Sequence, residues 1–405
     1  MKSLYYDVVI AGCGVAGLYT VLHLSKDKKI LMLSKGDLAS CDSMLAQGGI
    51  CVLHDEDDYD TFFEDTMRAG HYENREESVD IMIRSSREII NHLLELGVRF
   101  EKNPDGSLAY TKEGAHSIAR ICYHKDITGK EITTTLLSWV QKQENVTMWE
   151  YTEMTDILVE EDKCVGVVAK NPRGESIRIF AEDTVMATGG IGGLHDYSTN
   201  YPILTGDACR IARKHKIALE HMDYVQIHPT CLYREEKGRN FLISESARGE
   251  GAIILNHKGE RFVDELQPRD VVTEAIRREM KKEQVEYEYL SFEKVDREVI
   301  LRHFPHIYEK CLEEGYDILK EPVPIVPAQH YFMGGIHVDS NSQTTMEHLY
   351  AVGETSCNGV HGKNRLASNS LLESLVFAKR AAYHIEAKEK GEEKDESNYY
   401  AACCG

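Results

Sequence analysis

The sequence predicts an α/β fold in which a Rossmann-like domain is interrupted by an α+β capping domain. An apolar segment, residues 6–11, runs directly into a Gly-x-Gly-x-x-Gly turn and then into a helical pattern. Two later apolar segments, 183–187 and 349–352, also end in glycine. Strands that end in glycine-rich turns before helices are typical of doubly wound sheets. Between residues 222 and 331 this pattern gives way to charged helices and loops, which indicates the inserted domain.

The first glycine motif predicts a phosphate site made from backbone atoms. Gly12 permits the tight turn, Gly14 lets the main chain approach a pyrophosphate, and Gly17 lets the helix pack against the strand. The helix N-terminus adds unpaired N–H groups and a partial positive charge. The next strand, residues 30–33, is followed by Ser34 instead of the acidic residue that usually binds a ribose hydroxyl. The motif therefore predicts a dinucleotide site, and Ser34 argues against a plain NAD enzyme.

The other elements of the first domain follow from hydrophobic periodicity. Alternating residues and a turn at 171–174 predict antiparallel strands at 151–159, 164–169 and 176–181. Helical patterns span residues 59–70, 77–96, 130–142 and 208–216.

The second half of the chain defines the domain limits. Helices are expected at 271–283 and 296–303, then a Pro-rich extended connector at 322–327, and finally a long helix at 370–388. We therefore expect a dinucleotide domain made of residues 1–221 and 332–390, a capping domain of 222–331, and a charged tail of 391–405. Cys403 and Cys404 lie in this tail, and we expect both to be free thiols.

Composition excludes several classes of function. With 405 residues the chain can form two domains, or one large domain with an insertion. Its formal net charge of −20 makes it a poor general binder of nucleic acid or anionic membrane. No apolar run reaches about 18 residues, and no signal peptide pattern opens the sequence. Eleven cysteines without C-x-x-C pairs suggest reduced thiols, so we expect a cytoplasmic protein.

Polar side chains gather in four parts of the sequence. These parts are residues 112–117; 226–230 with 244–251; 268–270; and 330–335 with 362–370. Each residue alone has an ordinary explanation, His228 as a core histidine and Arg365 as a surface cation. His303 and His306 have no further ligands close by in the sequence, so we expect no metal site.

Together these segments resemble the succinate dehydrogenase/fumarate reductase flavoprotein family. The matching motifs keep the family's order over residues 6 to 380, and the resemblance is greatest to the branch that oxidises L-aspartate. The motifs are Gly12-x-Gly14-x-x-Gly17, Ala46-Gln47-Gly48-Gly49-Ile50, Ala187-Thr188-Gly189-Gly190, His228-Pro229-Thr230, Arg248-Gly249-Glu250-Gly251, Pro268-Arg269-Asp270, His330-Tyr331-x-x-Gly334-Gly335 and residues 364–373.

The resemblance implies FAD as the cofactor. Family members that bind flavin covalently carry a histidine just before the residue that matches Ser43, where this chain has Asp42. A dissociable, non-covalent FAD is therefore expected. The residues implied in binding it are Gly12, Gly14, Val15, Ala16, Gly17, Ser34, Lys35, Ser43, Gln47, Gly48, Gly49, Ala187, Thr188, Gly189, Asp207, Glu354, Asn369, Ser370 and Leu371.

Three features favour L-aspartate over succinate as the implied substrate. Alanine follows Leu366 where the dehydrogenases usually have glycine, and Asp42 replaces the linking histidine. Glu113 stands where the aspartate branch places a carboxylate that can face the substrate ammonium. A charge-assisted pair in a closed site discriminates between ligands by a few kcal/mol, which separates an amino acid from succinate.

The implied reaction converts L-aspartate to iminoaspartate. Arg365 and His330 are implied to bind one substrate carboxylate, because a guanidinium suits bidentate contacts. His228, with Ser244 and Glu245 nearby, is implied to bind the other.

Arg269 occupies the position of the family's proton-transfer group. An arginine has a pKa above about 12, so it serves either as an electrostatic stabiliser or as the proton donor in fumarate reduction. Gln226 completes the implied substrate-binding set, and the implied catalytic residues are Arg269, His228, His330 and Arg365.

The partners are implied by the same reaction. Reduced FAD can pass electrons to oxygen or to fumarate, and the sequence does not choose between them. Iminoaspartate is unstable in water, which implies hand-off to a quinolinate synthase in NAD biosynthesis. Two alternatives stay open, namely a fumarate reductase or succinate dehydrogenase flavoprotein and a flavin-binding subunit without turnover. Longer members of the aspartate branch continue into a helical domain, so we expect a short form whose oligomeric state is open.

Overall fold

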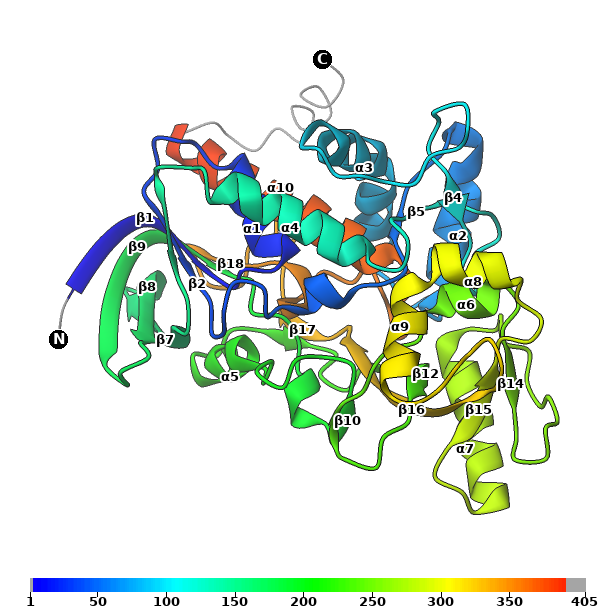
Figure 1. Cartoon of the computed structure of the whole chain (residues 1–405). Coiled ribbons are helices and arrows are strands. Elements are labelled where there is room, and N and C mark those ends of the chain that lie inside the picture. The colour runs from blue at the N-terminus through cyan, green and yellow to red at the C-terminus, as the bar shows by residue number, and fades with distance from the viewer. Residues whose placement is uncertain (1–2, 391–405) are drawn as a thin grey trace.

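The computed structural model describes residues 3–390, and its main layer is a sheet that contains the first glycine motif (Figure 1). In this range the sheet has seven strands in the order β6-β2-β1-β9-β8-β7, with β18 also paired to β9. The strands are β1 Ser3–Ala11, β2 Ile30–Leu33, β6 Val146–Trp149, β7 Glu153–Glu160, β8 Lys163–Lys170, β9 Ser176–Met186 and β18 Leu349–Ala351. Strands β6, β2, β1, β9 and β18 pair in parallel, and β7 and β8 continue the sheet antiparallel from β9.

Helices cover both faces of this sheet because β1 is apolar on both sides. Val8 and Ile10 face a core shared with helices α1, α3, α4 and α10, whereas Val9 and Ala11 face the core that contains α5. Figure 1 shows α10, α4 and α1 stacked above the strands and α5 below them. These helices, with α2 beside α3, are α1 Val15–His23, α2 Tyr59–Ala69, α3 Glu76–Glu95, α4 Thr128–Val140, α5 Asp207–Lys214 and α10 Asn369–Lys390.

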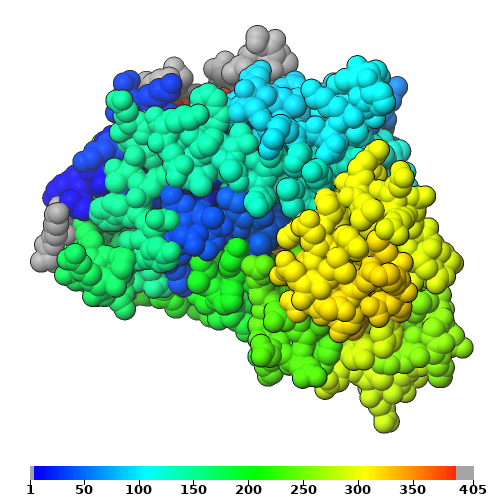
Figure 2. Space-filling view, viewed as in Figure 1, coloured from blue at the N-terminus to red at the C-terminus, as the bar shows by residue number. Residues whose placement is uncertain are grey.

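The inserted region forms its own sheet and core. Strand β16 is central and pairs with β12, β15 and β10. The strands of this sheet are β10 Tyr197–Ser198, β12 Val225–Leu232, β13 Gly238–Arg239, β14 Ile253–Leu255, β15 Glu288–Ser291 and β16 Val323–Phe332. The helices around it are α6 Glu245–Gly249, α7 Arg269–Glu283, α8 Arg297–His303 and α9 Pro305–Glu313. In Figure 2 this yellow-to-green region projects as a lobe from the rest of the molecule.

Short elements join the two regions. Two small sheets contain β3 Ile50–Cys51, β4 Tyr110–Thr111 and β5 Ile121–Cys122, and β11 Leu219–Glu220, β17 Gly335–His337 and β19 Ser356–Cys357. Single 3-10 turns are η1 Asp42–Leu45, η2 Glu56–Asp58, η3 Gly192–Leu194 and η4 Gly353–Thr355.

Two local expectations differ from the structure. Residues 176–181 and 183–187 were expected as separate strands, but β9 is continuous over 176–186. The expected Pro-rich connector lies inside β16. Pro324 keeps a useful role in the sheet because its carbonyl accepts from the Tyr233 N–H at 2.9 Å. Pro327 falls where the β12–β16 register shifts, so its missing N–H interrupts no ladder there.

Some expectations fall on residues that the structure does not describe. The charged tail 391–405, with Cys403 and Cys404, is outside the described residues. Among residues 3–390, every helix is too short or too polar to cross a membrane.

Candidate active site

One cavity of about 810 Å³ extends from the first glycine motif to the charged residues of the capping domain. Most of the residues that the sequence suggested for a cofactor line it. They are Gly12, Gly14, Val15, Ala16, Ser34, Lys35, Ser43, Gln47, Gly48, Gly49, Ala187, Thr188, Gly189, Asp207, Glu354, Ser370 and Leu371. Gly17 and Asn369 lie behind the wall. Figure 2 shows the mid-blue stretch around residues 36–50 between the blue-green α4 region and the green loops near residue 200.

The glycine end of the cavity is built from backbone. Gly12 has φ +122°, and a Cβ there would lie 1.9 Å from the Ala187 carbonyl oxygen, so β1 and β9 can approach only with glycine here. A Cβ on Gly17 would lie 2.2 Å from the Gly12 oxygen, which confirms its expected role in close packing of α1. The Ser43 hydroxyl accepts from the Val15 N–H at 3.1 Å. Gly14, Val15 and Ala16 line the cavity here, so the N-terminus of α1 lies at the cavity wall, which fits a pyrophosphate.

A lysine and an aspartate lie together beside this end. The Lys35 ammonium donates to Asp207 at 2.7 Å and to the Thr205 hydroxyl at 2.9 Å. Both charged residues line the cavity, although Lys35 follows β2 and Asp207 begins α5. The expected grouping of Lys35 and Asp207 near one part of a nucleotide is therefore geometrically possible.

Two half-buried carboxyl side chains, Glu354 and Asp42, line the cavity. Burial raises the pKa of Glu354 to about 8, and one of its oxygens accepts from the Phe332 N–H at 2.9 Å. Burial raises the pKa of Asp42 to about 7, and its Oδ1 accepts from the Tyr201 N–H at 2.9 Å. Asp42 Oδ2 is buried with no hydrogen-bond partner among residues 3–390. Protonated carboxyls of this kind can donate to the hydroxyls of a polyol chain.

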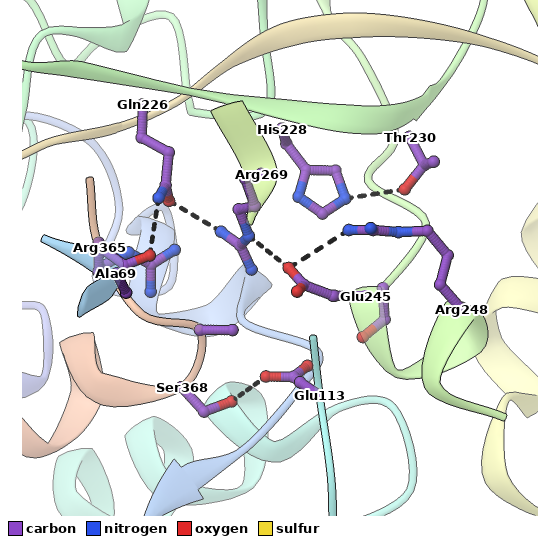
Figure 3. A network of polar contacts seen from close by, with 12 residues as sticks. Ala69, Glu113, Gln226, His228, Thr230, Glu245, Arg248, Arg269, Arg365 and Ser368 are labelled. Atoms are coloured by element: carbon purple, nitrogen blue, oxygen red, sulfur yellow. Dashed lines mark hydrogen bonds and ion pairs between the residues drawn. The ribbon is translucent and has the colours of Figure 1, made fainter. Parts of the chain in front are cut away.

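The far end of the cavity is held by a chain of buried polar contacts (Figure 3). Arg269, the first residue of α7, donates to Glu245 at 2.5 Å and to Gln226 at 2.9 Å. Gln226 in turn donates to the Arg365 carbonyl oxygen at 2.8 Å. Arg248 is also ion-paired with Glu245, at 3.3 Å. The chain links the capping domain to the loop that carries Arg365.

Arg365 is the cation best placed for a ligand. Its Nη1 donates to Ser370 at 2.7 Å, and its guanidinium carbon lies 4.5 Å from the centre of the Tyr331 ring. Its Nε is buried with no partner among residues 3–390. Burial, followed by the charge of Arg269, lowers the pKa of Arg365 to about 10, so the group is still a cation at neutral pH. No carboxylate is hydrogen-bonded to it within that range.

The two histidines occupy different positions. His330 lines the cavity, and its Nδ1 pairs with the Thr199 hydroxyl at 2.7 Å, which leaves Nε2 for a ligand. His228 is fully buried, does not line the cavity, and contacts the Ile243 carbonyl through Nε2 at 2.9 Å. Burial and nearby guanidinium groups hold both pKa values well below the ordinary range, so both imidazoles are neutral. Gln226, like His228, lies behind the cavity wall.

Two carboxylates of the cavity wall have opposite environments. Glu245 lies between Arg269 and Arg248, and these cations outweigh its burial and hold its pKa below the ordinary value. Among the described residues 3–390 the Glu113 carboxylate accepts only from two hydroxyls, Ser246 at 2.9 Å and Ser368 at 2.5 Å. Burial, followed by the charge of Glu245, raises the pKa of Glu113. The cavity wall therefore contains one carboxylate whose charge is compensated by arginines, Glu245, and one without a cationic partner among the described residues, Glu113.

This arrangement suits a small diacid that also carries an amine. Arg365, Arg269, His330 and Ser244 offer donors on the cavity surface, and Glu113 offers an acceptor. Sequence patterns placed these residues in the site and included Arg248, Ser246 and Ser368 in their motifs and polar segments, but they gave those three side chains no role. No local signal identifies a serine that meets a carboxylate more than one hundred residues away. Within residues 3–390 no group of three or more His, Cys, Asp or Glu side chains is arranged to hold a metal ion.

Comparison with known proteins finds relatives over most of the chain. A family model described as an FAD binding domain matches residues 7–371. An L-aspartate oxidase of Clostridium perfringens is 51% identical over 382 residues, which cover 94% of this chain and 87% of that protein. An L-aspartate oxidase of Clostridium acetobutylicum is 48% identical over 97% of this chain and 90% of its own.

A solved structure shares the same fold. The FrdA chain of E. coli quinol fumarate reductase superposes with a TM-score of 0.90 at 31% identity, covering 99% of this chain and 74% of FrdA. The expected α/β fold with its FAD-binding and capping regions is thereby confirmed.

Proposed function

The chain belongs to the L-aspartate oxidase family of FAD-binding flavoproteins, and on that basis we propose that it oxidises L-aspartate to iminoaspartate. The observation that supports this most directly is the pairing of free donors and a free acceptor at one end of the cavity. Arg365 has no carboxylate partner in the described chain, and Glu113 has no cationic one. A diacid with an amine would satisfy both.

The cofactor is FAD, and we propose that the glycine end of the cavity binds it without a covalent bond. The N-terminus of α1 and Gly14 would bind the pyrophosphate, Lys35 and Asp207 would lie near the adenosine, and Glu354 would meet the ribityl chain. Asp42 supports the dissociable form, because covalent members of the family place a histidine there. When bound, FAD supplies the acceptor for the hydride that leaves the substrate Cα.

We propose that Arg365 and His330 bind one substrate carboxylate and that Arg269 and Ser244 bind the other. Two fixed ends orient the Cα–H bond, and such positioning accounts for much of the rate enhancement in reactions of this kind. His228 would act from behind the wall, through its edge-to-face contact with His330 at a ring-centre distance of 5.3 Å. In this reaction Arg269 is proposed as an electrostatic group, because a guanidinium ion-paired with Glu245 is poorly suited to take up a proton.

Glu113 would receive the substrate ammonium. Loss of a hydride from Cα requires that the nitrogen also lose a proton, and the Glu113 carboxylate on the cavity wall would accept it. Its raised pKa makes it a better base than an ordinary glutamate. The same group would penalise succinate, which leaves the carboxylate buried and unpaired.

The deciding experiment is anaerobic titration of the purified yellow protein with L-aspartate. Bleaching of the flavin absorbance with release of ammonia is expected, and succinate should bleach it far more weakly. If succinate reduced the flavin as fast as L-aspartate, the fumarate reductase alternative would replace this proposal. If neither ligand bleached it, the chain would be a flavin-binding subunit without turnover.

Two further parts of the proposal concern the electron acceptor and the fate of the product. Fumarate carries the same two carboxylates as aspartate and would fit the same cations, so it is proposed as an acceptor beside oxygen. The imine hydrolyses in water, so we propose that it passes to a quinolinate synthase in NAD biosynthesis. Quinolinate formation in a mixture of both enzymes, compared at equal oxaloacetate production, would test that hand-off.

A further inference from the structure

Two serines to which the sequence motifs gave no role make the only hydrogen bonds to the Glu113 carboxylate within residues 3–390. Ser246 donates to Oε1 at 2.9 Å and Ser368 donates to Oε2 at 2.5 Å. All three side chains are buried, with Glu113 only 2% exposed. A carboxylate has about four acceptor sites, so each oxygen keeps capacity for one more donor. Neither hydroxyl brings a charge, and the negative charge of Glu113 stays uncompensated.

Each serine is itself fixed by its surroundings. Ser368 has φ +63°, a conformation that is costly for a residue other than glycine and that persists only where neighbours enforce it. Its backbone carbonyl accepts from the Cys51 N–H at 3.1 Å, and the preceding carbonyl, of Ala367, lies 3.0 Å from His116 Nε2. Figure 3 shows Ser368 directed at Glu113.

Ser246 connects Glu113 to Ser244 through hydrogen bonds. The Ser244 hydroxyl donates to the Ser246 hydroxyl at 3.2 Å, and Ser246 donates onward to Glu113. Ser244 also lines the cavity, where the proposed function assigns it to a substrate carboxylate. Ser244, Ser246 and Glu113 therefore form one hydrogen-bonded chain, in which the two hydroxyls donate in the same direction and the Glu113 carboxylate is the final acceptor.

A glycine leaves the space that this arrangement needs. A Cβ on Gly48 would lie 2.4 Å from Glu113 Oε1 and 3.1 Å from the Ser368 hydroxyl. Any larger residue at position 48 would displace the Glu113 carboxylate from its hydrogen bonds with Ser246 and Ser368. Gly48 thus borders both the glycine-rich end and the amine-binding end of the cavity.

From these contacts we propose that Ser246 and Ser368 are positioning residues that set the preference for an amino diacid over a plain diacid. Their hydrogen bonds hold the Glu113 carboxylate ionised and oriented toward the cavity. They leave its negative charge unpaired, whereas a lysine or arginine in their place would neutralise that charge. This inference rests on the proposed function, because it assigns the substrate amine to Glu113.

The test compares two reactions in the FAD-loaded enzyme, L-aspartate oxidation and fumarate reduction with a reduced dye. In Ser246→Ala and in Ser368→Ala we expect kcat/KM for L-aspartate to fall about 10-fold, and about 100-fold in the double variant, since each lost bond serves a charged group. Fumarate reduction should change less than about 3-fold. The acidic limb of the L-aspartate pH profile should move to higher pH.

Three further variants exclude a merely structural effect. Ser246→Thr keeps the hydroxyl and should restore activity. Ser368→Gly suits the left-handed backbone yet removes the hydroxyl, so it should be folded and show the same loss as Ser368→Ala. Ser78→Ala removes a buried hydroxyl that donates to the Asn358 carbonyl outside the cavity, and it should leave the ratio of the two activities unchanged.

A variant of Glu113 decides the question. In a Glu113→Gln background the serine substitutions should have no additional effect on the ratio of activities, because the serines act through Glu113. Additive losses, or equal losses in fumarate reduction, would overturn the inference while the unmodified enzyme still oxidised L-aspartate. If the unmodified enzyme failed to oxidise L-aspartate, the proposed function and this inference would both fall.

Discussion

Glu113 and Glu245 are equally buried in the same cavity wall, yet they serve opposite purposes. Each is 2% exposed. Glu245 is compensated by Arg269 and Arg248, and its pKa is lowered, whereas Glu113 has only hydroxyl partners, and its pKa is raised. A buried carboxylate with two guanidinium partners is part of the structural framework. A buried carboxylate without any cation costs folding free energy, and a cationic ligand can offset that cost. The difference in charge partners therefore suggests a structural role for Glu245 and a ligand-binding role for Glu113.

The largest effect is expected at the cation that faces these carboxylates across the cavity. Arg365→Ala removes the free guanidinium, so kcat/KM should fall about 1000-fold for both L-aspartate and fumarate, as in the loss of a buried charged contact. FAD content, read from the absorbance spectrum, should be unchanged. Normal L-aspartate turnover in this variant would refute the role given to Arg365.

Glu245→Gln should mainly affect folding. It leaves Arg269 and Arg248 buried without their shared carboxylate, which typically costs about 3 to 5 kcal/mol. Urea unfolding of the FAD-loaded protein should show a lower midpoint at pH 7. An unchanged midpoint would mean that Glu245 is no more structural than Glu113.

Glu113→Gln should mainly affect substrate choice. We expect kcat/KM for L-aspartate to fall about 100-fold, because the amine loses its charged partner, while fumarate reduction changes only a few-fold. Parallel assays on one preparation give the ratio directly. Equal losses in the two reactions would remove the distinction between the two carboxylates.

The pH dependence should follow the raised pKa of Glu113. L-aspartate oxidation needs the ionised carboxylate, so its kcat/KM should decline as the pH falls through that raised pKa. Fumarate carries no amine and should lack this limb. Profiles for both reactions over pH 5 to 9 in the same buffers would show whether the limb belongs to aspartate alone.

The smallest expected effect is the change of stability with pH, and it has opposite signs for the two residues. A raised pKa in the folded state means that ionised Glu113 opposes folding above that pKa, so Glu113→Gln should raise the unfolding midpoint at pH 8 and lose this gain toward acid. The lowered pKa of Glu245 means that its contribution is present at neutral pH and is lost as the pH falls through that pKa. Unfolding midpoints of Glu113→Gln at pH 5 and pH 8, and of Glu245→Gln at pH 7 and at a pH below the ordinary glutamate pKa, would measure both signs.

Local sequence patterns were sufficient for most of the first domain. The Gly12 turn, strand β2 and helices α2, α3 and α4 lie within a few residues of their expected places, since each depends on periodicity and turn chemistry nearby. The Pro-rich stretch in β16 was misjudged. Proline lowers local strand preference, but β12 and β15 pair with this segment from distant parts of the chain.

The fold class, the glycine-rich end of the cavity and most of the charged side chains that line its other end could be predicted from the residues in order. Glycine turns and short motifs encode their chemistry within a few positions, so no distant contact is needed to recognise them. Folding added that His228 and Gln226 lie behind the wall, and that Glu245 is neutralised while Glu113 is not. Charge compensation depends on which side chains come into contact in the buried space between two domains. Neither the spacing of residues along the sequence nor the composition indicates those contacts.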